Sequence, residues 1–104
     1  MVFSVQLENK FAADQRFYLF EFLSELQVGV SLVSAGVTCL LWSGTDASPS
    51  SMVSGSATID GTTVRQMIVG GVEGNIYTLV AAALTSDGQT VRVTGQLAIV
   101  PQRP

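Results

Sequence analysis

The sequence holds few side chains that could carry out chemistry, and they form no known catalytic pattern. Histidine is absent, so neither Cys39 nor any serine has the imidazole base that nucleophilic catalysis commonly uses. A single cysteine without histidine also cannot supply the ligands of a zinc site. Asp46, Asp60 and Asp87 lack the clustered spacing of a calcium loop. We therefore expect no catalytic, metal or cofactor site, and we expect Cys39 to be a small buried hydrophobe.

Trp42 and the polar stretch that follows it are the main candidates for binding. As the single tryptophan, Trp42 is either a core plug or rim residue of the fold, or a stacking platform for a sugar ring or a partner's aromatic residue. Residues 43–56 are rich in Ser, Gly and Pro, which predicts a surface connection. A loop of about a dozen residues is either mobile or functional. If it is a contact loop, we expect Asp46, Pro49 and Met52 to contact a partner, and a surface glycan is one candidate.

Composition and charge exclude several classes of protein. The chain is 47% hydrophobic and only 12% charged, so either Ser and Thr coat its surface or a partner covers apolar patches. Its net charge is −3 and its cations are scattered, which argues against binding to nucleic acid. No apolar window of about 18 residues is present to span a membrane, and the N-terminal residues do not resemble a secretory signal. One cysteine allows no intrachain disulfide, which fits folding in a reducing cytosol.

The strongest structural prediction is a hairpin near the end of the sequence. Within residues 76–85, one face of the expected strand carries Tyr77, Leu79, Ala81 and Ala83. The opposite face is also largely apolar, which indicates a strand covered on both sides or one that lies centrally in a sheet within an assembly. The Asp87-Gly88 pair then predicts a turn into a second strand over residues 90–100.

Two segments in the first quarter of the chain each allow two interpretations. Phe3, Val5 and Leu7 alternate with more polar residues and predict a strand with one apolar side. This strand is either the first strand of the domain or an arm that pairs with a neighbouring subunit, in which case these three side chains contact a partner. Residues 17–23 are dense in aromatic residues and favour a strand, with a helix over residues 11–26 as the alternative.

The middle of the chain predicts three further extended segments. Residues 28–32 and 37–42 read as strands, with a turn at residues 34–36 between them. Residues 57–69 contain a second Asp-Gly pair, Asp60-Gly61, with strand signals on both sides. This segment is either a hairpin or two short strands that belong to successive sheets.

One motif in the C-terminal hairpin suggests a family. The motif is a Gly, two residues, a Tyr, a run of small apolar residues, and then Thr-Ser-x-Gly-x-Thr. Its fixed positions are Gly74, Tyr77, Thr85, Ser86, Gly88 and Thr90. The motif resembles the closing hairpin of immunoglobulin-like and fibronectin-III-like sandwiches and, more narrowly, of small immunoglobulin-like structural proteins of tailed bacteriophages. The resemblance implies an all-β fold: an Ig-like or fibronectin-III-like antiparallel β-sandwich with Greek-key connections and an extended N-terminal arm.

The resemblance also implies a domain organisation and a function. Residues 1–15 would be the arm, residues 16–100 the sandwich and residues 101–104 a tail. Structural roles are expected for Cys39, Gly88 and Tyr77, whose hydroxyl would bond back to nearby corner backbone.

By the same resemblance, the chain would be a non-enzymatic structural virion protein, a head, neck or fibre component made in the host cytoplasm. Its partners would be capsid, neck or tail proteins and further copies of itself, with no nucleic acid and no membrane. The alternative function is a carbohydrate-binding or adhesive Ig-like module.

Overall fold

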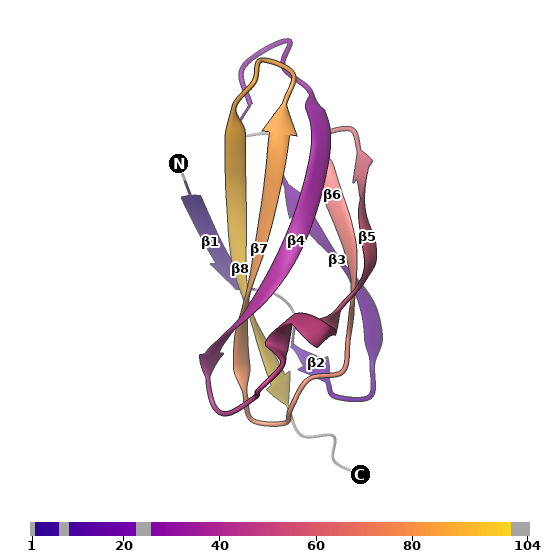
Figure 1. The fold of residues 1–104 in the computed structure, drawn as a ribbon, viewed down its shortest axis with the longest axis vertical. Coiled ribbons are helices and arrows are strands. Elements are labelled where there is room, and N and C mark those ends of the chain that lie inside the picture. The colour runs from indigo at the N-terminus through magenta and orange to yellow at the C-terminus, as the bar shows by residue number, and fades with distance from the viewer. Residues whose placement is uncertain (1, 7–8, 23–25, 101–104) are drawn as a thin grey trace.

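The computed structural model describes residues 2–6, 9–22 and 26–100, and the fold of these residues is all-β. Its elements are β1 (Val2–Gln6), β2 (Lys10–Phe11), β3 (Gln15–Glu21), β4 (Leu32–Ser43), the short 3-10 helix η2 (Pro49–Met52), β5 (Val53–Asp60), β6 (Thr63–Val69), β7 (Ile76–Thr85) and β8 (Thr90–Val100). The strands form two sheets that pack face to face as an elongated sandwich, with extents of 48 × 21 × 21 Å (Figure 1).

The larger sheet has the strand order β1-β8-β7-β4, and β2 also pairs with β8. The predicted C-terminal hairpin is confirmed, because β7 and β8 pair antiparallel from Ile76 opposite Ala98 to Leu84 opposite Thr90. On its other edge β7 pairs antiparallel with β4. β7 therefore lies between β8 and β4 inside this sheet, in agreement with a central position, one part of what its two apolar faces predicted.

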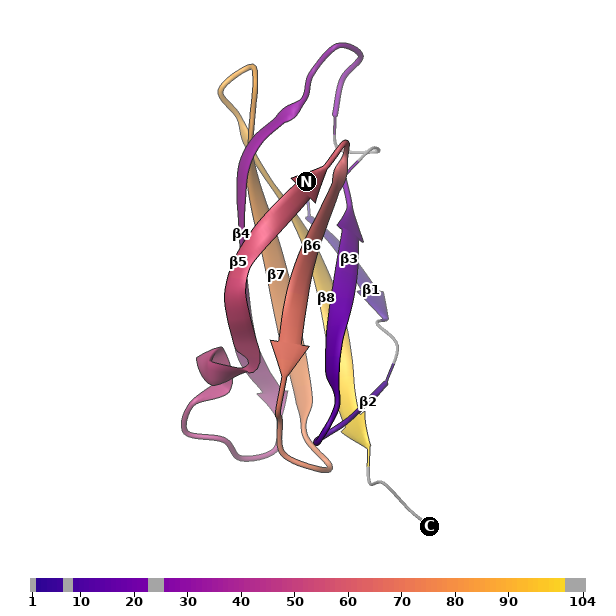
Figure 2. The ribbon, with the colours of Figure 1, turned by 90° about the vertical axis from the view of Figure 1, so that its right-hand side faces the viewer.

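The smaller sheet has the order β3-β6-β5, with antiparallel pairing throughout (Figure 2). The second Asp-Gly pair forms a tight hairpin within this sheet: Asp60 pairs with Thr63, and Gly61 has a φ of +65°. A glycine at the first central position is what a two-residue type II′ turn requires. Residues 57–69 are thus one hairpin rather than strands of successive sheets.

The core lies between the inner faces of the two sheets. Its buried side chains include Tyr18, Phe20, Phe22, Val37, Cys39, Met52, Val64, Ile68, Tyr77, Leu79, Ala81, Ala83, Val93, Leu97 and Ile99. Of the two apolar faces of β7, the one that carries Tyr77, Leu79, Ala81 and Ala83 is therefore the one that faces the core. Residues 15–21 form a strand, so the helical alternative for this segment is wrong: alternation with period two buries Tyr18 and Phe20 in the sandwich.

The start of the chain pairs within the same molecule. Residues of β1 pair in parallel with β8, from Val2 opposite Arg92 to Gln6 opposite Gln96. β2 continues along the same edge, with Lys10 opposite Ile99. In the single chain, the described part of the expected arm therefore forms an edge of the larger sheet. The last residue of that arm, Gln15, already belongs to β3.

Two predicted boundaries in the middle of the chain are wrong. The turn at residues 34–36 is absent because β4 runs through it, and a preceding loop takes the place of the strand expected at residues 28–31. Gly36 simply pairs with Ala82 in the ladder, so a small residue here marks no turn. The predicted long loop is also shorter than residues 43–56, because its second half forms η2 and the start of β5.

Candidate functional site

A polar cluster at the lower end of the sandwich in Figure 1 fastens the loop after β4 to the corner before β7. The buried Tyr77 hydroxyl donates a hydrogen bond to Asp46 Oδ2 at 2.7 Å. It accepts hydrogen bonds from the Val72 backbone N–H at 3.1 Å and from Asn75 Nδ2 at 3.3 Å. Asn75 Nδ2 also donates to the Thr45 carbonyl at 2.9 Å. The bond to Val72 is the corner contact expected of Tyr77, and the cluster links two segments that lie far apart in sequence.

Both carboxylate oxygens of Asp46 are engaged within the chain. The Ser48 backbone N–H donates to Asp46 Oδ1 at 2.9 Å, and this bond, followed by the bond from the Tyr77 hydroxyl, lowers the pKa of the Asp46 carboxyl. Burial, and then the hydrogen bond to Asp46, raise the pKa of Tyr77. The cluster therefore holds an ionised carboxylate against a protonated phenol, an arrangement that positions backbone and has no activated nucleophile.

The single cysteine lies in the core. Cys39 Sγ is 3.9 Å from Met52 Sδ, and burial, followed by the charge of Asp46, raises the pKa of the thiol to about 12. A protonated buried thiol is a poor nucleophile. Met52 is only 2% exposed, so the prediction that its side chain contacts a partner is wrong: η2 turns Met52 inward to close the core.

A buried lysine closes the same end of the molecule. Lys10 Nζ donates to the carbonyls of Gly70 at 2.6 Å and Phe11 at 2.8 Å, with a longer contact of 3.4 Å to Ala12. Burial lowers the pKa of Lys10, and the nearby charge of Asp14 partly opposes that shift. The Lys10 ammonium group is thus hydrogen-bonded within the chain, and its bond to the Gly70 carbonyl joins β2 to the end of β6.

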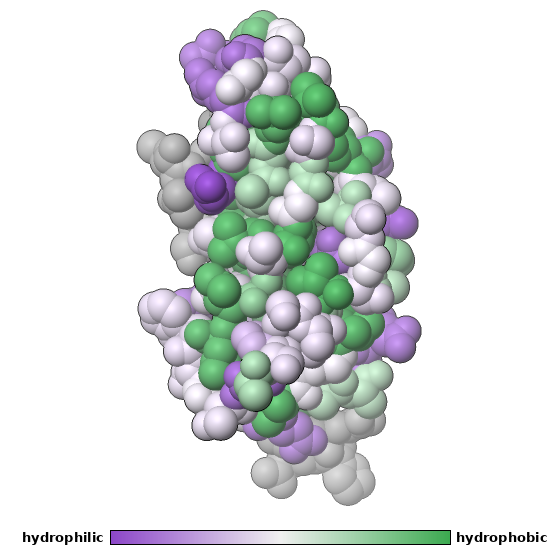
Figure 3. All heavy atoms as spheres, in the orientation of Figure 1, coloured by the Kyte–Doolittle hydropathy of each residue, from purple (hydrophilic) through white to green (hydrophobic). Residues whose placement is uncertain are grey.

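The outer surface of the larger sheet is the first of two exposed apolar surfaces. We call it the large-sheet face and define it by the outward residues of β4, β7 and β8. They are Val33, Ser34, Gly36, Thr38, Leu40, Trp42, Ile76, Thr78, Val80, Ala82, Leu84, Thr90, Arg92, Thr94, Gln96, Ala98 and Val100. In Figure 3 green apolar residues, with white ones between them, run along the length of the molecule on this side. Leu40 at its centre is 56% exposed, and an apolar surface of this kind commonly marks an interaction site.

The outer surface of the smaller sheet is the second exposed apolar surface, called here the small-sheet face. It consists of the outward residues of β3 and β6, among which Phe17 is 51% exposed and Leu19 is 60% exposed. Arg65 stacks over the Phe17 ring, 4.0 Å from its centroid. Glu21 accepts hydrogen bonds from the Thr62 and Thr63 hydroxyls at one end of this face. The two faces lie on opposite sides of the sandwich.

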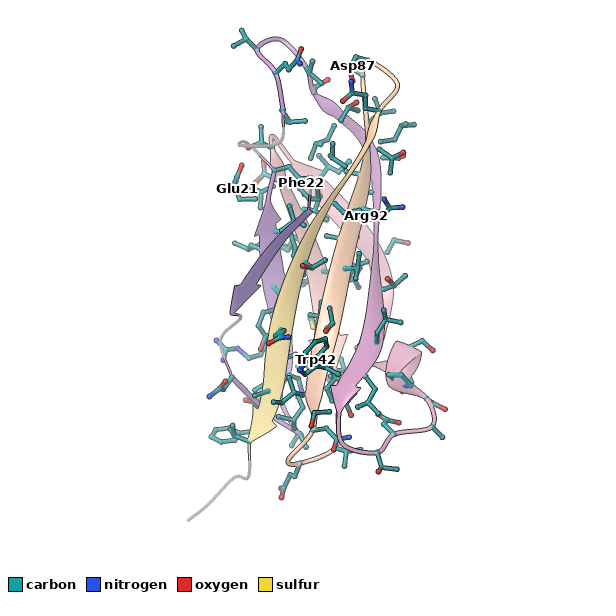
Figure 4. All side chains as sticks on the ribbon, turned by 90° about the vertical axis from the view of Figure 1, so that its left-hand side faces the viewer. Glu21, Phe22, Trp42, Asp87 and Arg92 are labelled. Atoms are coloured by element: carbon teal, nitrogen blue, oxygen red, sulfur yellow. The ribbon has the colours of Figure 1, made fainter. Side chains whose placement is uncertain are left out.

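The structure brings only some of the predicted contact residues to the surface. Trp42 is 64% exposed on the large-sheet face, so its interpretation as a core plug is wrong. A register shift between Leu41 and Ser43 places it beside the outward-facing Ile76, and Figure 4 shows it on the lower half of the sheet. Pro49 opens η2 and is half-buried.

The remaining predicted contacts come from the start of the chain. Phe3 and Val5 lie in β1, opposite Val93 and Gly95 of β8, and Leu7 lies outside the described residues. Sequence reasoning singled out neither Leu40 nor Phe17 and Leu19 as surface residues. Alternation along each strand could have identified them. Leu40 lies on the opposite face of its strand from Cys39, and Phe17 and Leu19 lie on the opposite face from Tyr18 and Phe20.

The described part of the chain holds neither clustered metal-ligating side chains nor membrane-spanning helices. Within residues 2–6, 9–22 and 26–100, no three or more His, Cys, Asp or Glu side chains gather to hold a metal ion. Over the same residues, no helix has the length and apolar character that crossing a membrane demands. What the described surface does offer is two apolar sheet faces, which is typical of a structural or binding protein.

Comparison with known proteins places this sandwich among phage proteins. Residues 10–98 match the family described as podophage GP4 fiber-tail adaptor protein gp77, and the chain belongs to that family. No curated protein matches the chain significantly. The match spans all the elements from β2 to β7 and most of β8. The chain is therefore a structural protein of a tailed-phage virion, as the hairpin motif suggested.

Proposed function

We propose that this protein is a non-enzymatic adaptor that joins a fibre to the tail of a podophage and is made in the host cytoplasm. The observation that carries the proposal is the family match over residues 10–98. The chemistry of the described residues supports it, because the cysteine is buried and the carboxylate of Asp46 is occupied by internal hydrogen bonds. The function of such a protein is geometric: it holds two other parts of the particle at a fixed separation.

The proposed adaptor domain is Ig-like. In immunoglobulin domains the second, fifth and fourth strands share one sheet, and the third, sixth and seventh share the other. Here β3-β6-β5 faces β8-β7-β4, which supports the same grouping with β1 and β2 together as the first strand. That first strand lies beside β8 instead of β3. The hydrogen bond from Val72 to the Tyr77 hydroxyl at the start of β7 supports a tyrosine corner.

An adaptor needs at least two separate contact surfaces, and the two sheet faces are suited to that task. They point in opposite directions, and each exposes large apolar side chains. A specific, stable protein interface buries roughly 800 Å² on each partner. Each face of an elongated sandwich 48 Å long offers surface on this scale.

The experiment is to make a podophage that lacks this gene product and to examine its particles. We expect virions with assembled heads and tails that lack fibres, and that regain them when the protein is supplied in trans. Mass spectrometry of wild-type particles should detect the chain in them. Fibres that remain in place on particles without this protein would overturn the adaptor proposal.

A carbohydrate-binding role is the second candidate, and it rests on the exposure of Trp42 alone. Asp46, the polar partner expected beside it, already bonds to Tyr77 and Ser48. If the role holds, a glycan array should give binding that is lost in Trp42→Ala and kept in the Leu19→Ser control. An array without any wild-type signal would rule out the glycans tested.

A further inference from the structure

The first two strands of the fold run in the same direction as the last strand, along one edge of the larger sheet. β1 pairs in parallel with β8, beginning with Val2 opposite Arg92. β2 continues along the same edge, where Lys10 lies opposite Ile99. Every other pairing between described strands is antiparallel. The parallel pairs therefore fasten the beginning of the described chain directly to its end.

The parallel direction places the start of β1 and the end of β8 at different heights in the sandwich. Val2 lies beside Arg92, near the upper turn, and Val100 lies eight residues further along β8. At a rise of about 3.4 Å per residue, this separation is about 27 Å along the strand. Figure 1 shows the N-terminus beside the upper half of the sandwich and the C-terminus below its lower end. A pull that separates the two ends therefore slides β1 along β8.

We propose that β1 and β2 form a clamp with β8, and that this clamp lets the protein bear tension between its two ends. The tension passes from β1 across the ladder to β8, without crossing β7 or the smaller sheet. The proposal goes beyond the adaptor function and does not rest on it, because resistance to force is a property of the single chain. For a virion part, it would keep the fold intact under a pull along the long axis.

The geometry of the ladder explains why the clamp is strong in this direction. Ladder hydrogen bonds lie across the strands, so sliding one strand along the other strains all of them at the same time. Five paired positions in β1 and two in β2 share the force. When a strand is instead peeled from its end, the pairs break one after another and each bears the whole force. Sliding therefore requires the greater force.

The rest of the fold resists the same pull less well once the clamp has opened. The next strand, β3, begins at Gln15, which pairs with Val69 at the lower end of β6. The last strand also ends at the lower end, at Val100. Figure 2 shows the start of β3 and the end of β8 together there. Without the clamp, both points of pulling lie at one end of the 48 Å sandwich, and the strands peel apart from that end.

The direction of β1 favours the clamp over a simpler role in covering the edge of β8. A covering strand could run either way, and antiparallel pairing is both commoner and slightly more stable per residue. An antiparallel first strand would begin beside the lower end of β8, so a pull between the ends would peel it away. Only the parallel direction places the force along the ladder.

The first test compares two directions of pulling on the folded chain by single-molecule force spectroscopy. One molecule carries handles at its two ends, and the other carries them at Ala13→Cys and at the C-terminal end. Ala13 is exposed in the turn before β3, so the second pull begins at the lower end and peels β2 from β8. Cys39 is buried, with a thiol pKa of about 12, and should take no handle. We expect the end-to-end pull to need at least about twice the force. Equal forces would overturn the proposal.

The second test removes single hydrogen bonds from the clamp with two adjacent prolines. Successive backbone N–H groups of a strand point to opposite edges, and β1 has β8 on one edge only. Ser4→Pro and Val5→Pro are therefore a matched pair, since one loses a bond to β8 and the other an outward N–H. One of them should lower the end-to-end force by at least about a third and the other should leave it near the wild-type value. If both variants kept the wild-type force, or lost it equally, β1 would not be a clamp.

The third test separates resistance to force from equilibrium stability. Tyr77→Phe removes hydrogen bonds from the lower cluster, which lies outside the path of the tension. It should lower the free energy of unfolding but change the end-to-end force by less than about a tenth, because forced unfolding follows the barrier that opens the clamp. The proline that loses its bond to β8 should lower the force. A force that fell with stability in Tyr77→Phe as well would show that the core resists the pull and would rule out the clamp.

Discussion

The two ends of the sandwich are both closed by polar side chains, but they differ in how deeply the residues that bond to distant segments are buried. At the lower end, Tyr77 and Asn75 bond to the loop after β4, about 30 residues away in sequence, and these groups are buried. At the upper end, the Thr85 hydroxyl bonds to Asp87 and accepts from the Gln89 backbone N–H within a single turn, and the bonds to the distant Ser31 are made by Ser86, with both serines exposed. Long-range closure with buried groups should be the costlier to break, because a buried group that loses its partner is not rehydrated.

The largest expected effect contrasts one glycine from each end. Gly44 has a φ of +115°, and a Cβ added there would lie 1.9 Å from Asn75 Oδ1. Gly88 has a φ of +87°, but nothing lies within 4 Å of its added Cβ. Gly44→Ala should therefore cost about 3 kcal/mol through strain and displacement of Asn75, whereas Gly88→Ala should cost about 1 kcal/mol from backbone strain alone. Denaturant unfolding measures both, and equal losses would show that the lower end is no more constrained than the upper.

The next effect comes from the hydroxyl at the centre of the lower cluster. Tyr77→Phe keeps the ring in the core but removes the partner of Asp46, Asn75 and the Val72 N–H. We expect a loss of about 2 kcal/mol in the free energy of unfolding, because the Val72 N–H is left without its acceptor. Tyr18→Phe, at another buried tyrosine of the core, serves as the comparison. A loss below about 0.5 kcal/mol for Tyr77→Phe would mean that water replaces these bonds.

The same cluster should make the lower end sensitive to acid. The pKa of Asp46 lies below its ordinary value of 3.8 because of the bonds from Ser48 and Tyr77. A carboxyl whose pKa is lower in the folded state stabilises the fold above its unfolded pKa. That contribution is lost as the pH falls from 3.8 through the folded value. The stability difference between wild type and Asp46→Asn should therefore shrink in this acid range, as followed by thermal unfolding. A difference that does not change with pH would contradict the role given to the Asp46 carboxylate.

The contrast between the ends also explains what the sequence could predict. Periodicity with period two predicted β7 and β8, Asp87-Gly88 predicted the turn between them, and Asp60-Gly61 gave a hairpin as one of two alternatives, because these features depend on residues close together in sequence. The density of aromatic residues favoured a strand over residues 17–23, but the sequence did not show which of its two apolar sides faces the core. The turn over residues 85–89 at the upper end follows from such local rules, whereas its bonds to Ser31 do not.

The features that local rules missed depend on contacts between distant segments. Asp46 was expected to contact a partner protein. Instead it accepts a hydrogen bond from the Tyr77 hydroxyl, which belongs to a strand that only the fold brings near. Met52 lies in a stretch of Ser, Gly and Pro that reads as exposed, yet η2 turns it onto Cys39. Trp42 falls on the same face of β4 as Leu40, opposite Cys39, but the segment alone does not show that this face is left uncovered. Such placements require the pairing register, which no single segment contains.

The smallest expected effect lies at the upper end, where the loop before β4 meets the β7–β8 turn. Ser86 Oγ accepts from the Ser31 N–H at 3.0 Å, and the Ser86 N–H donates to the Ser31 carbonyl at 2.8 Å. Ser86→Ala removes the first bond only, and both residues are exposed, so water can take the place of the hydroxyl. The loss should be about 0.5 kcal/mol or less, with faster amide exchange at Ser31 and unchanged exchange at Asn75 on the lower end. A loss as large as that of Tyr77→Phe would show that exposed, paired loops hold this sandwich together as strongly as its buried cluster does.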